Sequence, residues 1–147
     1  MSLFLGGTSS ANECHDYEEG SFTMSLSQGS NTSNSGRYVK IGTMVLAAGN
    51  VSLDNISSGS TVQINGLPFT SDGGGVGRSY NGAIRGYNCS NISGSGMRPT
   101  NAVIHGDGTN VQFGTFESAQ AWSMMQYNDF TSTNNSIRWT CVYKSND

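Results

Sequence analysis

The sequence IRWTCVYK, residues 137–144, decides the fold class of this chain. Its apolar and aromatic side chains fall on every second position, at Ile137, Trp139, Cys141 and Tyr143. The intervening positions are Arg138, Thr140, Val142 and Lys144. An alternation with period two is typical of a β-strand with one buried face. The segment therefore predicts a strand near the C-terminus whose aromatic face packs on a core.

A second segment with the same alternation lies near the start of the chain. Phe22, Met24 and Leu26 alternate there with small polar residues. Because both terminal strands are well specified and should face a shared core, the sequence predicts a closed or sandwiched sheet system.

The middle of the chain adds shorter strands joined by turns. Gly42-Thr43 suits a type II′ hairpin turn between the predicted strands Tyr38–Ile41 and Met44–Leu53. Further strands are predicted at Thr61–Asn65, Ser79–Gly86, Ala102–His105 and Val111–Phe116. Ala119–Tyr127 fits either a helical stripe or a strand. The expected fold is all-β, an antiparallel, jelly-roll-like β-sandwich of about eight to ten short strands.

Length and charge exclude several classes of protein. At 147 residues the chain has room for one core. Seven basic residues without a cluster and a net charge of −3 argue against nucleic-acid binding. No apolar run approaches the roughly 18–20 residues of a membrane span, so no membrane insertion is expected.

The cysteines predict neither a disulfide framework nor a zinc site. Cys14, Cys89 and Cys141 cannot all pair within one chain, and none has CxxC spacing. Cys141 is expected to be a small core residue. Synthesis in a reducing cytoplasm fits this pattern, and no metal or cofactor is predicted.

Two groups of residues suggest catalysis only superficially. Glu13, His15, Asp16, Glu18 and Glu19 could form a metal site or an acid/base pair, but no partner cluster follows them. His105 lies close to Asp107, yet the Gly-Asp-Gly context favours a β-turn. The sequence therefore predicts no catalytic residues and no enzyme.

A polar and aromatic set gives the candidate ligand-binding residues: Arg78, Tyr80, Arg85, Tyr87 and Trp122. Sugar recognition uses flat aromatic faces beside planar hydrogen-bonding groups. The alternative is that these aromatics fill the core or a subunit interface. Tyr80 and Tyr87 have opposite parity along the predicted strand, so a regular strand cannot turn both inward.

Three phrases resemble the C-terminal domain of bacteriophage tail-fibre and related virion proteins. They are Asp16-Tyr17-Glu18-Glu19-Gly20-Ser21-Phe22-Thr23, Gly36-Arg37-Tyr38-Val39-Lys40-Ile41-Gly42 and Ile64-Asn65-Gly66-Leu67-Pro68-Phe69. The resemblance extends from Asp16 to Lys144. It implies a homotrimeric fibre tip in the virion, synthesised in the host cytoplasm, and favours a strand over Ala119–Tyr127. Such a tip binds a host-surface glycan or protein receptor, or caps the fibre.

The predicted organisation is a flexible connector over residues 1–16, which ends a longer fibre or shaft, and a tip domain over 17–147. Two alternatives stay open. One is a purely structural module for trimerisation or decoration. The other is a small glycan depolymerase of the tailspike type, which the lack of paired carboxylates outside the connector disfavours.

Overall fold

The computed structural model describes residues 3–4, 13–14, 16–29, 34–53, 58–73, 79–87, 99–116, 122–130 and 135–146. Nearly all of the regular structure in these ranges is extended strand. The strands of the large sheet are β3 (Tyr17–Thr23), β4 (Ser25–Leu26), β5 (Asn34–Ile41), β6 (Met44–Leu53), β7 (Gln63–Asn65), β8 (Ser79–Tyr87), β9 (Pro99–His105), β10 (Asn110–Phe116), β11 (Trp122–Met124) and β12 (Asn135–Lys144). Tyr127–Asp129 forms a single 3-10 turn.

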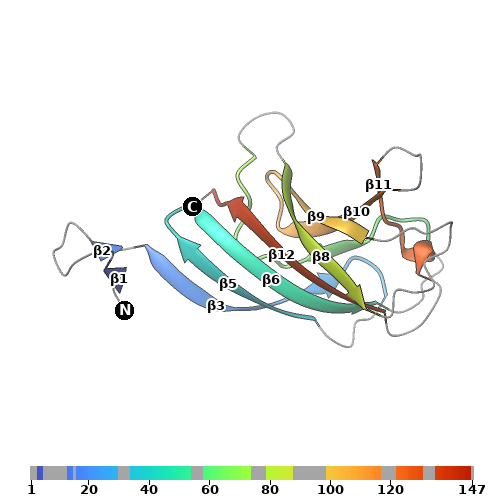
Figure 1. Cartoon of the computed structure of the whole chain (residues 1–147), viewed down its shortest axis with the longest axis horizontal. Helices are drawn as coiled ribbons and strands as arrows, with labels where there is room; N and C mark the ends of the chain where they lie inside the picture. The colour runs from blue at the N-terminus through green and yellow to red at the C-terminus, as the bar shows by residue number, and fades with distance from the viewer. Residues whose placement is uncertain are drawn as a thin grey trace.

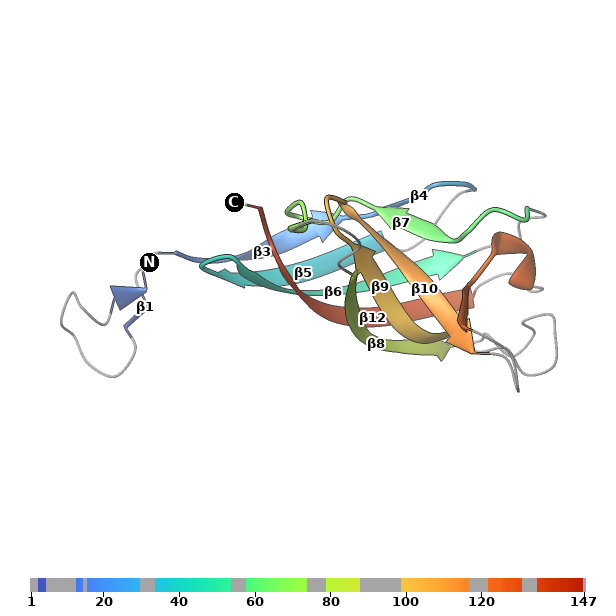
Figure 2. The same ribbon diagram turned by 90° about the horizontal axis from the view of Figure 1, so that it is seen from above.

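The ten strands form one antiparallel sheet that curls back on itself (Figures 1 and 2). Its order is β3-β5-β6-β12-β8-β9-β10-β7-β4, and β11 pairs with β10. The two ends of this order, β3 and β4, are separated in the sequence only by Met24. One continuous segment thus pairs with β5 on one side and with β7 on the other. The sheet is nearly closed, and the expected all-β antiparallel fold is confirmed.

The core lies inside this curled sheet, and β12 crosses its centre. β12 pairs with β6 over ten residues and with β8 over five. Ile137, Trp139, Cys141 and Tyr143 are at most 3% exposed, and the residues between them are open to solvent. Met24 is also buried, and Phe22 and Leu26 pack against the same core. Both predicted terminal strands are therefore confirmed with their faces as expected.

The turns follow the predicted chemistry with one difference. Gly42 has a φ of +58°, as a type II′ turn requires at its first central position, and joins paired residues Ile41 and Met44. Asp107 also has a positive φ, of 60°. Its carboxylate accepts a hydrogen bond from the amide of Gly73, 3.1 Å away, rather than from its own turn. The turn therefore also fixes a distant loop.

The segment Ala119–Tyr127 contains no helical stripe in its described part. Trp122–Met124 is a strand on the edge of β10, and the 3-10 turn follows. Residues 119–121 lie outside the described residues. The strand interpretation holds for the part that is described.

A separate two-stranded sheet joins β1 (Leu3–Phe4) to β2 (Glu13–Cys14). It lies beyond the end of the curled sheet in both views (Figures 1 and 2). This sheet was not predicted from the sequence, because two-residue strands are too short to show a periodicity. None of the described residues belongs to a helix with the length and hydropathy of a membrane span.

Candidate functional site

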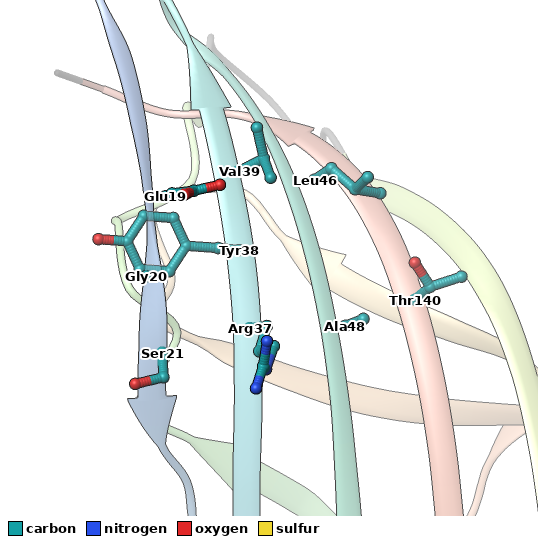
Figure 3. Close-up of a pocket in the computed structure, with 9 residues that line it drawn as sticks. All are labelled: Glu19, Gly20, Ser21, Arg37, Tyr38, Val39, Leu46, Ala48 and Thr140. Carbon is teal, nitrogen blue, oxygen red and sulfur yellow. The ribbon is translucent and has the colours of Figure 1, made fainter. Parts of the chain in front are cut away.

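An open groove runs along the outer face of β3, β5, β6 and β12 (Figure 3). Its volume is about 560 Å³. The apolar floor consists of Val39, Leu46 and Ala48, and hydrogen-bonding groups surround it at Glu19, Ser21, Arg37 and Thr140. These positions share one face because side chains alternate along paired strands. The groove could accommodate an amphipathic ligand, with Arg37 and Glu19 as its charged groups.

An exposed apolar patch continues from this groove. We define it by Ile41, Met44, Leu46 and Val142, which are 37–53% exposed. The register places Leu46 between Val39 and Val142, and Met44 beside Ile41. Four of the five large exposed hydrophobic side chains among the described residues are therefore contiguous. A contiguous exposed apolar surface of this kind is typical of an interaction site.

Glu18 and Glu19, two of the candidate acid/base residues in the sequence, each accept a hydrogen bond from a tyrosine. Tyr17 donates a hydrogen bond to Glu19 (2.8 Å), and Tyr38 donates one to Glu18. These hydrogen bonds raise the pKa of each tyrosine, with burial and the carboxylate charge adding to the shift. Glu18 and Glu19 are consecutive on a strand and so belong to opposite faces. They cannot flank one sugar as a glycosidase pair does.

Trp122 belongs to a different polar cluster, on the outer side of β8, β9 and β10. Its indole N–H donates to Oδ1 of Asn101 (3.3 Å), and the Asn101 amide donates to Oδ1 of Asn81 (2.9 Å). A Cβ on Gly114 would overlap the indole nitrogen, so the absence of a side chain there leaves room for the ring. Trp122 is 40% exposed. We call Trp122, Asn101 and Asn81 the tryptophan cluster.

His105 is engaged by neutral partners. Its Nδ1 lies 3.2 Å from the Ser79 hydroxyl, and its Nε2 lies 3.2 Å from Oε1 of Gln112. Gln112 then donates to Gln63, and Gln63 donates to Asn65. This row of hydrogen bonds crosses four strands. Asp107 contributes nothing to it, which agrees with the turn interpretation of His105 and Asp107.

The contact between Ser79 and His105 was not predicted from the sequence. The two residues are 26 positions apart and meet only because β8 pairs with β9 in that register. No local motif encodes such a pairing. Because no carboxylate among the described residues orients the imidazole, the contact lacks the third member of a nucleophilic triad.

The three predicted ligand residues whose side chains are described, Tyr80, Arg85 and Trp122, do not lie together. Tyr80 faces the core, where its ring lies 6.3 Å from that of Tyr143 and its hydroxyl donates to the Asp72 carbonyl. Arg85 points outward from β8, opposite Arg138 of β12. Trp122 lies on β11, in the tryptophan cluster. Arg78 and the side chain of Tyr87 lie outside the described residues.

The described residues provide no metal centre and no activated thiol. They contain no group of three or more His, Cys, Asp or Glu side chains placed to hold an ion. Burial raises the pKa of the Cys141 thiol to about 11, so it stays protonated. Cys141 is the predicted core residue.

Comparisons with known proteins gave no relative. The chain matches no protein-family model, and no significant match was found among curated proteins or solved structures. The resemblance to tail-fibre domains therefore remains a prediction from the three phrases.

Proposed function

We propose that this chain is a tail-fibre-like virion domain that binds a host-surface glycan through the tryptophan cluster. The single observation that supports this function is the half-exposed Trp122, with the amides of Asn101 and Asn81 in line with its N–H. The virion location and the trimeric state belong to the same proposal and derive from the sequence resemblance.

The chemistry of the cluster suits a neutral sugar. A pyranose presents a C–H face that packs on an aromatic ring and hydroxyl groups that need planar donors and acceptors. Asn101 is hydrogen-bonded on both sides, to Trp122 and to Asn81, so its amide orientation is fixed before a ligand arrives. Such preorganisation lowers the entropic cost of binding.

Binding to arrays of immobilised bacterial surface polysaccharides tests the proposal. Trp122→Ala should weaken binding by about tenfold or more, since it removes the stacking surface. Ser35→Ala is the control, because Ser35 is exposed on β5 and belongs to neither the tryptophan cluster nor the apolar patch. A Trp122→Ala protein that binds like wild type, or a wild type that binds no polysaccharide, would contradict glycan binding by this cluster.

A purely structural role is the second candidate, and the apolar patch favours it. In a trimeric tip this surface would be covered by a neighbouring subunit, and this role requires no glycan site. Light scattering on wild type and on a Leu46→Gln, Val142→Thr double variant tests this role. A wild-type monomer at micromolar concentration would rule out the trimeric tip.

A further inference from the structure

Two arginines stand directly opposite one another on the outer face of the sheet. Arg85 of β8 and Arg138 of β12 are paired in register, and both are exposed. Side chains at directly opposite positions have Cβ atoms about 5 Å apart. The inner neighbours of Arg138, Ile137 and Trp139, are buried, which fixes the outward direction of the arginine.

This arrangement is unfavourable for the isolated protein. Like charges at directly opposite positions destabilise a sheet. The outward positions around Arg85 and Arg138 hold Ala83, Tyr87, Thr140, Ser136 and Asn50, none of which is an acidic or basic residue. The ion pair found among the described residues is formed by Lys144 and Asp72, and it involves neither arginine. Neither arginine therefore has a carboxylate partner in the described part of the chain.

We propose that Arg85 and Arg138 form an oxyanion-binding site for the sulfate, phosphate or carboxylate groups of a ligand. Each guanidinium presents several N–H donors in a planar fork that matches these groups in a bidentate manner. An anion bound between the two guanidinium groups would accept hydrogen bonds from both and offset the repulsion between their positive charges. Both arginines are exposed, so the forks are accessible. The site uses other residues than the tryptophan cluster and stands whether or not that cluster binds a sugar.

Binding of dextran sulfate, compared with neutral dextran, tests the site. Wild type should bind the sulfated polymer more tightly than the neutral one, and this difference is the binding assigned to the arginines. Arg85→Gln and Arg138→Gln should each weaken that binding by about tenfold, because either change removes half of the site. Lys144→Gln is the control. It removes one positive charge from the outward face of the same strand as Arg138, but Lys144 is paired with Asp72 (2.8 Å), and binding should change by no more than about twofold.

Competition with inorganic sulfate and phosphate shows whether the site binds a free anion or only an anion carried by a polymer. If either ion competes with dextran sulfate at millimolar concentration, the site recognises the anionic group itself. If neither ion competes, or if Lys144→Gln reduces polymer binding as much as the pair variants do, binding follows net charge and the proposal is wrong.

A stability measurement excludes a merely structural role for the pair. Without added anion, Arg138→Gln should melt at the same temperature as wild type or higher, because the substitution relieves repulsion. A clear loss of stability would overturn the interpretation of an unfavourable pair. Trp122→Ala should leave the difference between dextran sulfate and neutral dextran binding unchanged, so failure of the arginine site and failure of the glycan proposal are distinguishable.

Discussion

The ring of Tyr38 lies across Gly20, which is directly opposite it on the neighbouring strand. A Cβ on Gly20 would come within 2.8 Å of the tyrosine oxygen. The relationship recurs two residues along, where Phe22 covers Gly36. The first two phrases on which the resemblance rests are thus paired with each other in β3 and β5. Their glycines leave space for the aromatic ring of the opposite strand.

The Phe22–Gly36 contact predicts a specific coupling. Gly36→Ala should destabilise the fold by about 1–3 kcal/mol, because its Cβ would overlap the Phe22 ring in a packed setting. Gly20→Ala should cost less, since its Cβ would come no closer than 2.8 Å to Tyr38, whereas a Gly36 Cβ would lie closer than that to Phe22. Urea denaturation of Gly36→Ala, Phe22→Leu and the double variant measures the coupling. Strictly additive costs would show that the ring and the glycine do not depend on one another.

Much of the fold could be predicted because it depends on local patterns. The alternation in residues 137–144 defined both the strand and its buried face, and Gly42-Thr43 defined a hairpin. The two terminal strands predicted a closed or sandwiched sheet system, but not the particular closure that forms. This closure depends on Met24 separating two short strands that pair with partners far apart in the sequence, β5 and β7.

The residues of the candidate sites were harder to predict from the sequence, because strand order brings them together. Parity shows that Arg85 and Tyr80 face opposite ways, but only the strand order brings Arg138 beside Arg85. In the same way, Asn101 meets Asn81 and Trp122 across separations of 20 and 21 residues. Trp122 itself was predicted as a ligand residue, whereas its two amide partners carry no motif that would reveal them.

The two tryptophans should respond differently to the loss of their N–H groups. Trp139 is 3% exposed, and its Nε1 has no hydrogen-bond partner among the described residues. Trp139→Ala should cost about 3–5 kcal/mol, as for other large core truncations. Trp139→Phe should cost clearly less, because it also removes an unpaired buried donor. Thermal denaturation compares them, with the exposed Trp122→Phe as a control expected to cost under about 1 kcal/mol.

Equal costs for Trp139→Phe and Trp139→Ala would contradict this account. They would mean that the six-membered ring kept in Trp139→Phe adds nothing to stability, so that the whole cost comes from what both variants lose, the indole N–H included.

Cys141 predicts a loss of stability in alkali. Burial raises the pKa of its thiol from 9.0 to about 11, so the folded state holds the proton more tightly than the unfolded state does. The stabilisation is fully present below pH 9 and is lost as the pH rises toward 11. Urea midpoints of wild type and Cys141→Val, measured between pH 8 and pH 11, should therefore converge or cross as wild type weakens. Parallel curves would show that the thiol does not titrate differently in the two states.

The same burial predicts low reactivity. In a Cys14→Ser, Cys89→Ser background, the remaining thiol should react with a thiol reagent at pH 8 only after denaturation, because the thiolate is the reactive form and Cys141 is 2% exposed. Full reaction of the native protein within minutes would contradict the buried position.

Asp107 combines a left-handed backbone with a long-range hydrogen bond, and substitutions separate the two. Asp107→Asn keeps an acceptor for the Gly73 amide and tolerates a φ of 60°, so it should cost least. Asp107→Gly removes only the hydrogen bond and should cost about 1 kcal/mol. Asp107→Ala loses the bond and also strains the backbone, for a total of about 2–3 kcal/mol. Denaturant unfolding should give this order, and an alanine variant as stable as the glycine variant would show that the positive φ is not enforced by the fold.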